Sequence, residues 1–538
     1  MKRTFALILA LVLALTFVAC GNSPAPAETK APSAGGSASG STSGGSADNT
    51  PAPVKDTLVI AIEQEGNDFD PQNSGVAFSS AGIIRNVYDP LIRNNPDGTV
   101  YGVLATSWEW INDGMALDFK LRENVYFTNG ELFTADDVLY SYQVRFPTSS
   151  MGKSETIFDF ENMEKVNDYE IIIPLKKLAS DALNQLTHMK YSIMNQKAVE
   201  EAGDKAGIQP VGTGAYVLKE WVQGDRTVLA ANENYWGEAP RLKEVTIRII
   251  KESAQAEIEL ENGNVDAVIF SVGNNDVLRV MNGEIPGLKT ISLWNGVNCL
   301  QFNFKKEFAN NKLVRQALNY AVDREALSKA DSNGLNPPAY QPGIPTHACY
   351  IDEYNTNIPY EYNPEKAKEL LKEAGYENLT LELYTDVSAA CVTDAQLLKN
   401  MFATAGVTLN IHSLEPGTVV PLVITGDEDD VFLGFGISDW TGSILQRFRS
   451  ASDPGYSPDF DNHRFSDVFN EVYEKFLVAE KTLDRDEAVR IMRECSQIEV
   501  ENALQIPLTT TSIYINCVEN FQLQWNFGDP NFLNWYFE

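Results

Sequence analysis

The sequence predicts an α/β protein whose globular body divides into two or three domains. Three observations support this prediction. Short apolar runs typical of buried strands alternate with amphipathic helices, strands and helices are mixed rather than segregated, and no internal repeat is found. The chain has 538 residues, and the body from about Val54 to Glu538 is too long for one hydrophobic core.

The N-terminal segment has the order of a bacterial lipoprotein signal peptide followed by a tether. In residues 1–19, two cationic side chains precede an apolar run that is shorter than the roughly 20 residues of a spanning helix. Cleavage before Cys20 would leave its thiol to carry a diacylglycerol anchor, and the alternative is a secretory signal with an incidental cysteine. Residues 20–53 are almost all small or polar, so we expect a disordered spacer of about 30 Å root-mean-square length.

Short apolar runs mark the strands of the body, and none of them is apolar enough to cross a bilayer. The strand candidates, in chain order, are Thr57–Ile62, Leu117–Leu121, Glu170–Ile173, Val245–Ile250, Leu379–Tyr384 and Val407–Ile411.

Capping residues and apolar spacing mark the helices. Thr134 is placed to cap a helix whose third residue is Asp137, so Asp136 and Asp137 are interpreted as first-turn acids rather than a catalytic pair. Further helices are predicted from Asn363-Pro364 to Gly375, over Ser466–Lys481 and over Asp484–Glu499.

Charge and composition exclude several classes of function. The formal net charge of -32 argues against nucleic acid and anionic lipid headgroups as partners, because phosphate binding depends on clustered Lys and Arg. The five cysteines after Cys20 form no C-x-x-C pair, which argues against a disulfide framework but leaves one or two bridges open. The four histidines show no metal-ligand spacing, so we expect no metal site and no cofactor.

Motifs of common enzymes are missing from the sequence. Gly212-Thr213-Gly214 lacks the third glycine of a dinucleotide loop and precedes the strand-like Tyr216-Val217-Leu218, so a tight turn is the better interpretation. There is no G-x-S-x-G, H-E-x-x-H or P-loop sequence. A catalytic triad can assemble from distant residues, so an enzyme is disfavoured rather than excluded.

A series of short blocks spread over nearly the whole body resembles the family 5 solute-binding proteins of ABC importers, which include the oligopeptide, dipeptide and nickel receptors. The blocks occur in the order seen in that family, and together they are specific for the family but not for its ligand. They are Asn86–Leu91, Asp97-Gly98, Leu104–Trp108, Phe119–Arg122, Phe127–Gly130, Thr134–Val138, Val211–Tyr216, Asn234–Trp236, Gln301–Asn303, Val314–Leu318 and Ala321–Arg324.

The resemblance implies a two-lobed fold of the periplasmic-binding-protein type, type II and similar to cluster C, with an accessory domain and a ligand cleft between the lobes. Closure of such lobes is a hinge motion that ligand binding stabilises. The implied domains are lobe I from residues 54–88, 211–292 and 506–538, the accessory domain from 89–210, and lobe II from 293–505.

The resemblance also implies a set of ligand-binding residues. In peptide-binding members an aspartate in the segment matching Gly434–Trp440 holds the α-ammonium group of the peptide, and Asp439 matches it here. Trp440 and Phe435 would form walls for ligand side chains, and Trp294 and Asn298 precede the Gln301 strand where the hinge passes the pocket. The alternatives are an ordinary loop acid for Asp439 and inter-domain packing for the aromatic residues.

The chain departs from the family in two places. Gly436 stands where a tryptophan often precedes the aspartate, and the Asp-Pro that often follows it is missing, so we expect a reshaped pocket. Dipeptide receptors carry an arginine in the segment matching Thr385–Thr393, and no basic residue occurs there in this chain. A strict dipeptide receptor is therefore disfavoured.

The sequence thus predicts a monomeric receptor, lipid-anchored at the extracytoplasmic face of the membrane, that captures short peptides and delivers them to an ABC permease. The alternatives are a receptor for another solute, such as a metal chelate, a glycan or a peptide-like molecule, a peptide sensor, and an extracellular hydrolase.

Overall fold

The computed structural model describes residues 55–73, 78–150, 152, 156–269, 272–415, 418–419, 422, 429–435, 467–525 and 530–538. The chain divides into two units, Met1–Pro53 and Val54–Glu538, and all described residues belong to the second. Among them, no helix has both the length and the apolar character that a membrane span requires. The predicted anchor at Cys20 lies outside the described residues.

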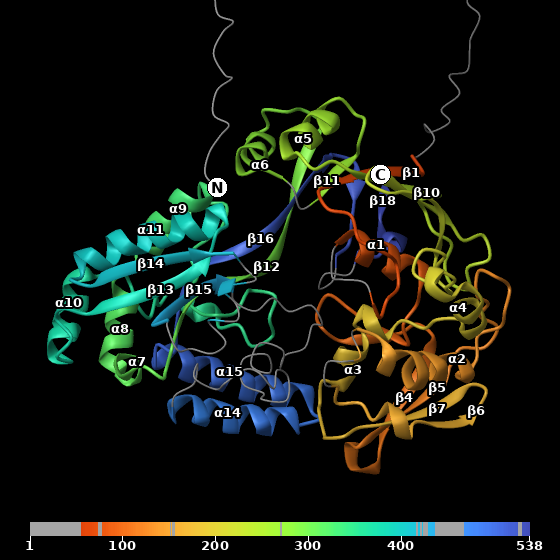
Figure 1. Cartoon of the computed structure of the whole chain (residues 1–538), viewed down its shortest axis with the longest axis horizontal. Helices are drawn as coiled ribbons and strands as arrows, with labels where there is room; N and C mark the ends of the chain where they lie inside the picture. Colours follow the sequence, from red (N-terminus) through yellow and green to blue (C-terminus); the bar gives the residue numbers. More distant parts are fainter. Residues whose placement is uncertain are drawn as a thin grey trace, which may run out of the picture. The chain divides into compact units, whose positions relative to one another are not determined.

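The described residues contain a sheet of ten strands in the order β14-β13-β15-β12-β16-β11-β1-β10-β9-β8 (Figure 1). On one side β13, β14 and β15 run parallel to one another, and on the other β1 runs parallel to β10 and β11. The strands are β1 Thr57–Ile62, β8 Tyr216–Val222, β9 Arg226–Ala231, β10 Glu244–Ile249, β11 Ala267–Ile269, β12 Leu288–Phe302, β13 Thr380–Asp386, β14 Thr408–Leu414, β15 Val431–Phe435 and β16 Gln505–Val518.

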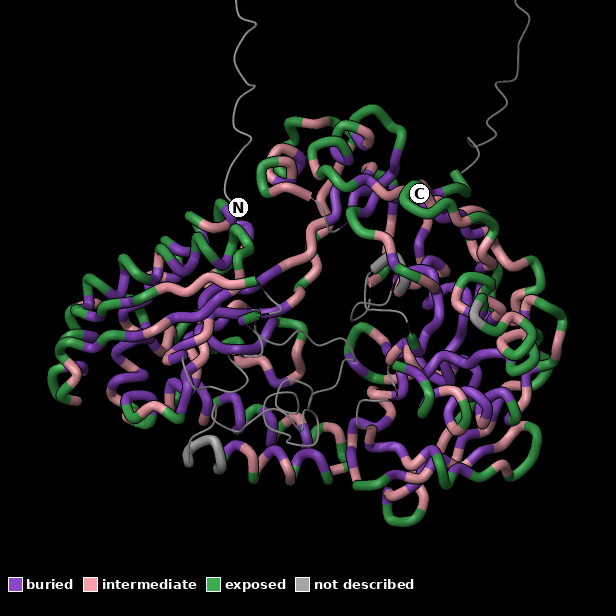
Figure 2. The backbone as a smooth tube through the Cα atoms, in the orientation of Figure 1, coloured by how far each residue is buried: buried purple, intermediate pink, exposed green. Residues whose placement is uncertain are grey.

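The two longest strands, β12 with 15 residues and β16 with 14, form an antiparallel ribbon that joins the two parallel groups. The pairing extends from Leu288 opposite Val518 to Gln301 opposite Gln505. Strand β16 is rich in Ile, Thr and Val, whose branched side chains favour extended backbone. Residues 506–511 and 515–517 of β16 are buried, whereas Ser512–Tyr514 between them are only partly buried (Figure 2). This β12–β16 ribbon therefore leaves one core and enters another.

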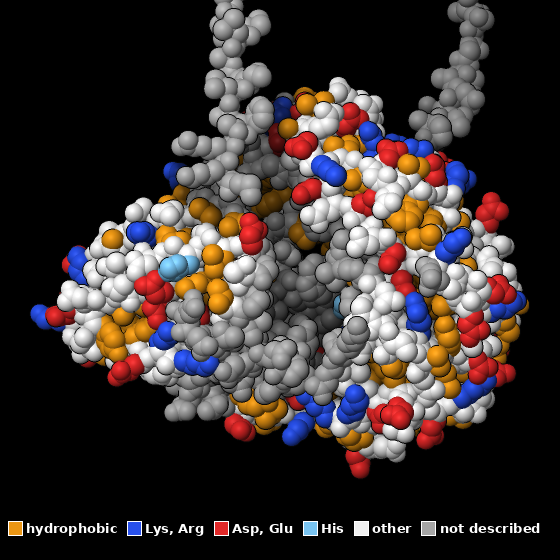
Figure 3. Space-filling model, in the orientation of Figure 1, with side chains coloured by type: hydrophobic (Ala, Val, Ile, Leu, Met, Phe, Trp, Pro, Cys, Tyr) orange, Lys and Arg blue, Asp and Glu red, His pale blue; other side chains and the backbone are white. Residues whose placement is uncertain are grey.

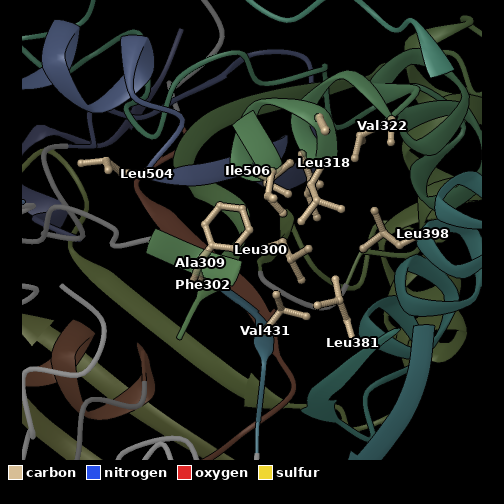
Figure 4. Packing of buried hydrophobic residues seen from close by; sticks show 14 of the residues in the cluster. Leu300, Phe302, Ala309, Leu318, Val322, Leu381, Leu398, Val431, Leu504 and Ile506 are labelled. Carbon is tan, nitrogen blue, oxygen red and sulfur yellow. The ribbon is translucent and has the colours of Figure 1, made fainter. Parts of the chain in front are cut away.

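The first core, here the β13–β15 cluster, forms around β13, β14, β15 and the adjoining ends of the ribbon. Leu300 and Phe302 of β12, Val431 of β15, Leu381 of β13 and Ile506 of β16 converge in it (Figure 4). Burying each such side chain stabilises the fold by about 1.5 to 3 kcal/mol. The helices that contribute to the cluster are α7 Glu307–Asn310, α8 Lys312–Tyr320, α9 Arg324–Ser332, α10 Pro364–Glu373, α11 Ala389–Thr404, α14 Asp467–Glu480 and α15 Arg485–Glu501.

The second core, here the β1 cluster, lies at the other end of the ribbon and includes Ile60 of β1, Val245 of β10 and Ile515 of β16. Helix α1, Phe78–Val87, packs into it through Ile83 and Ile84. Other elements of this part of the chain are α5 Ser253–Glu261, α6 Asn274–Met281, β17 Phe521–Gln522 and β18 Tyr536–Phe537.

The third core, here the accessory cluster, is formed mainly by residues between Leu91 and Ile193. It contains a separate four-stranded antiparallel sheet in the order β4-β5-β7-β6. Its elements are β2 Ile92–Asn94, β3 Val100–Gly102, β4 Ala105–Ile111, β5 Ala116–Leu121, β6 Glu164–Asn167, β7 Glu170–Pro174, α2 Ala135–Leu139, α3 Ala182–Leu186 and, beyond it in the chain, α4 Gln196–Ala202. The domain boundaries expected from the sequence stay predictions.

Most local predictions are confirmed. The strand Thr57–Ile62 has the predicted bounds, and the five other predicted strands are found with ends that differ by one to three residues. Thr134 and Asp137 form the expected capping box, Asn363 and Asp484 cap α10 and α15, and Gly375 adopts a positive φ of 80°. The five cysteines of the described residues are buried.

The two glycines of Gly212-Thr213-Gly214 are needed because the backbone packs closely there, and not because a turn requires a positive φ. A Cβ atom on Gly212 would lie 2.0 Å from the carbonyl oxygen of Val87, and one on Gly214 would lie 2.4 Å from that of Asn86. The main chain therefore packs directly against the end of α1, and neither glycine has a positive φ.

A buried carboxyl group on α11 links stability to pH. Asp394 is 2% exposed, and its Oδ1 has no hydrogen-bond partner among the described residues. Burial, with a smaller contribution from Asp331 on α9, raises the pKa of Asp394 to about 7. The unfolded chain therefore releases the Asp394 proton at lower pH than the folded chain does, so this group lowers stability as the pH rises from about 4 to 7.

We expect Asp394→Asn to gain stability over the wild type across this pH range, by up to roughly 4 kcal/mol at pH 7, and to show no further gain above it. Urea unfolding at several pH values measures this difference. Asp352→Asn, at an exposed position, is the matched control and should show no such trend. A gain that does not depend on pH would contradict the assignment.

Candidate ligand-binding site

The structure describes three of the five predicted ligand-binding residues. Trp294 and Asn298 lie within β12, which begins well before the predicted strand at Gln301, and Phe435 is the last residue of β15. Asp439 and Trp440 lie outside the described residues. The site is therefore described from the ribbon and from the strand ends beside it.

One row of backbone positions crosses three neighbouring strands. Asn298 of β12 pairs with Phe435 of β15 on one side and with Thr509 of β16 on the other. Residues directly opposite each other in antiparallel strands direct their side chains to the same face of the sheet. Asn298 and Thr509 therefore share a face, at the place where β15 ends.

Trp294 lies on the opposite face from Asn298. A spacing of four residues would put both on one face of a regular strand. However, a register shift occurs between Trp294 and Gly296, so that Trp294 pairs with Ser512 and Asn298 with Thr509. Because Ser512 and Thr509 are three residues apart on β16, they point to opposite faces. The bulge thus separates two residues that the sequence placed beside one pocket, and Trp294 is 40% exposed.

Two threonine hydroxyls on the Asn298 face are not foreseen from the sequence. Thr509 and Thr511 are buried, and their Oγ1 atoms have no hydrogen-bond partner among the described residues. Thr510 on the other face donates from its Oγ1 to the carbonyl oxygen of Pro337 at 3.1 Å. The run Thr509-Thr510-Thr511-Ser512 at a lobe boundary is the signal that could have revealed them.

The carboxyl ends of the parallel strands meet at one edge beside the ribbon. Strands β13, β14 and β15 end at Asp386, Leu414 and Phe435, and because they are parallel these ends share an edge. Helix α11 begins directly after β13, where Ser388 caps it by accepting from the N–H of Cys391. In open α/β sheets, ligands bind outside the carboxyl ends of the strands.

A second loop follows the carboxyl end of β1. There Asp70 accepts hydrogen bonds from the N–H of Gln72 at 2.9 Å and from the side-chain amide of Asn73 at 3.0 Å, and it forms an ion pair with Arg145. Nearby, burial raises the pKa of the Tyr88 hydroxyl, so Tyr88 stays neutral. The carboxyl ends of the strands on both sides of the ribbon thus carry ordered polar loops.

The chemistry of the described residues is that of binding. No group of three His, Cys, Asp or Glu side chains in the described ranges could hold a metal ion. On the face that Figure 3 shows, the basic side chains of the described residues are interspersed with acidic ones. Amide, hydroxyl and main-chain groups of the ribbon can form hydrogen bonds to a polar ligand without chemical change.

The ten-stranded sheet contains two groups of parallel strands that are joined by an antiparallel ribbon and carry polar groups at their carboxyl ends. This arrangement defines a two-lobed α/β binding protein. Sequence comparison identifies which one. The chain belongs to the bacterial extracellular solute-binding proteins, family 5, whose middle region matches residues 99–455. The members of this family are binding proteins for transport and not enzymes.

The relatives agree with this assignment. The chain is 25% identical over 489 residues to the glutathione-binding protein GsiB of Salmonella typhimurium, covering 90% of this chain and 94% of GsiB. The solved structure of DppA from Helicobacter pylori with the peptide STSA is similar with a TM-score of 0.70 and 24% identity, over 90% of this chain and 98% of that one. NikA from Brucella suis with Fe(III)-EDTA gives 0.76 and 20%, over 90% and 100%. The resemblance and the two-lobed, type II periplasmic-binding-protein fold predicted from the sequence are confirmed.

Replacing Thr509 by Val should stabilise the ligand-free protein by about 1 kcal/mol, because the valine keeps the shape and removes a buried hydroxyl that has no hydrogen-bond partner among the described residues. The matched control is Thr510→Val, which should destabilise by about 1 kcal/mol because it removes the bond to Pro337. Chemical unfolding of both variants measures the difference. Equal losses in the two variants would mean that the Thr509 hydroxyl has a partner in the folded protein.

Proposed function

We propose that this protein is a lipid-anchored receptor that captures short peptides between its lobes and delivers them to an ABC permease. One observation supports this most directly. Strand β15 ends beside Asn298 at the shared carboxyl edge of three parallel strands, and Asp439 follows that end by four residues in sequence. The end of β15, where ligand binding is expected, therefore comes shortly before Asp439 in the sequence, and this supports the proposal.

In this proposal Asp439 binds the α-ammonium group of the peptide. A cation that leaves water needs a carboxylate partner, and truncating one member of such a buried pair costs about 2 to 5 kcal/mol. Asn298 contributes its side-chain amide from β12, and Phe435 and Trp440 form walls for ligand side chains. Trp294, on the other face of the ribbon, has a secondary role at the edge of the pocket.

The ligand is proposed to be a short peptide longer than a dipeptide, because Thr385–Thr393 contains no basic residue for a nearby carboxylate. One structural neighbour holds the peptide STSA and another, AppA from Bacillus subtilis, holds a nonapeptide. The second candidate is a peptide-like solute such as glutathione, which the name of the GsiB relatives favours. With either ligand, the protein is proposed to act as a monomer at the extracytoplasmic face of the membrane.

We expect Asp439→Ala to weaken binding of the peptide Ser-Thr-Ser-Ala by about 2 to 5 kcal/mol, because the ammonium group loses its carboxylate partner. Isothermal titration calorimetry of the purified protein measures this loss. Asp352→Ala, at an exposed position, is the control and should bind as the wild type does.

The N-acetylated peptide sharpens this test because it lacks the ammonium group. The wild type should bind it weakly, and Asp439→Ala should bind both peptides alike. Full affinity of the variant for the free peptide would remove Asp439 from the anchoring role. Binding of glutathione in place of both peptides would favour the second candidate.

We expect Cys20→Ser to leave peptide affinity unchanged while the protein is released from the cell, because the serine cannot carry the thioether-linked anchor. Release lowers the local concentration at the permease and therefore lowers peptide uptake. Cell fractionation and uptake assays of a strain that carries only this variant measure both effects. Unchanged uptake with a released protein would contradict the role of the tether.

A further inference from the structure

The β12–β16 ribbon joins the β13–β15 cluster to the β1 cluster. A separate contact joins the β13–β15 cluster to the part of the chain that forms the accessory cluster. Helices α14 and α15 pack side by side and bury Phe476 and Met492 in the β13–β15 cluster (Figure 1). The tip of this hairpin, Ala479–Arg485, contacts Asp97, Gly114 and Lys177–Ser180. These two sets of residues are here called the hairpin latch.

Within the latch, Ser180 binds the C-terminal end of α14. The last carbonyl groups of a helix have no partners within the helix. Here the N–H of Ser180 donates to the carbonyl oxygen of Glu480 at 2.7 Å, and the Ser180 hydroxyl donates to that of Ala479 at 3.1 Å. Ser180 therefore adds two hydrogen bonds to the end of this helix, beside those from Lys481 and Thr482.

Charged groups add to the same contact. The Lys177 Nζ lies 3.4 Å from the Glu480 carboxylate, whose side chain is 3% exposed. A cation at this place also interacts favourably with the negative end of the α14 dipole. At the start of α15, Arg485 donates from Nη2 to the carbonyl oxygen of Asp97 at 2.8 Å.

The apolar part of the latch is small and depends on a glycine. A Cβ atom on Gly114 would lie 2.7 Å from Cδ1 of Leu178 and 3.2 Å from Cδ1 of Leu483, so the glycine lets both leucines pack over its backbone. Gly114 also has a φ of 85°, which other residues rarely adopt. Leu483 stays 44% exposed. Contacts of this kind, small and polar, separate at low cost.

The junction between the accessory cluster and α1 is built differently. Asp89 is 2% exposed and accepts hydrogen bonds from Thr213 Oγ1 and Trp236 Nε1, both at 3.1 Å. Arg93, which is 4% exposed, lies 3.4 Å from the same carboxylate. Separating this junction would leave a charge in an apolar setting, so we expect it to stay intact when the lobes move.

We propose that the hairpin latch forms when the lobes close and sets the rate at which ligand leaves. The latch is a small, partly exposed contact, whereas the ribbon is a covalent connection, so rotation at the ribbon breaks the latch first. A contact made only in the closed state raises the population of that state and slows its opening. Ala479–Arg485 and Ser180 are therefore positioning residues that act on the ligand through closure. This inference rests on the proposed function.

Leu483→Asp tests the latch, because it places a carboxylate against Leu178 and Gly114. Val478→Asp is the matched control, since Val478 lies near the C-terminal end of α14, five residues before Leu483, and is 55% exposed. In the full-length protein with Ser-Thr-Ser-Ala bound, hydrogen–deuterium exchange of residues 177–182 should quicken roughly tenfold in Leu483→Asp alone, and the same difference should be smaller without ligand, where the closed state is less populated. Unchanged exchange would overturn the proposal.

Binding kinetics of Ser-Thr-Ser-Ala supply the readout that a purely structural role would not move. The dissociation rate should rise roughly tenfold in Leu483→Asp, while the association rate and the melting temperature stay near those of Val478→Asp. A slower association with unchanged dissociation would overturn the proposal. If neither the wild type nor any variant binds the peptide, the proposed ligand is wrong. The hydrogen–deuterium exchange measurement without ligand then tests the latch by itself.

Discussion

The antiparallel pairing of β12 and β16 is the constraint on which the rest of the structure depends. β15, β13 and β14 extend the sheet from β12, while β11, β1 and β10 extend it from β16. Each parallel group needs its own hydrophobic core, since parallel strands are stable only when both faces are covered. The ribbon thus connects two cores through a stretch that neither covers fully, which is the place where a two-lobed receptor can bend.

Two junctions of the accessory cluster differ in how readily they separate when the lobes move relative to each other. The junction at Asp89 is buried and hydrogen-bonded, so its separation would expose a charge network and is costly. The junction at Ser180 and Leu483 is smaller and partly exposed, and it combines hydrogen bonds to backbone carbonyl groups with one ion pair and the packing of two leucines. A receptor needs both kinds, because it must keep its lobes rigid and still release its ligand. Weak closure contacts shift the balance between open and closed states without making either permanent.

Local sequence patterns predicted local structure well and long-range structure poorly. Thr57–Ile62 and the cap at Thr134 were predictable because strand pattern and capping are set by neighbouring residues. The face of the sheet to which Trp294 points was not predictable. It depends on a bulge in the pairing of β12 with β16, whose residues lie more than 200 positions away in the sequence. The contacts of Ser180 with α14 and of Gly212 with Val87 leave no local pattern either. The family resemblance led to the proposed binding role of Asp439, which composition and spacing alone did not suggest.

The central claim is that this protein holds a peptide between its lobes and returns it unchanged. Native mass spectrometry of freshly purified protein, followed by fragmentation of whatever dissociates, tests it most directly. We expect a noncovalent one-to-one complex whose released component fragments as a short, intact peptide. A released component without peptide bonds, or cleavage of added peptides during incubation, would contradict the account.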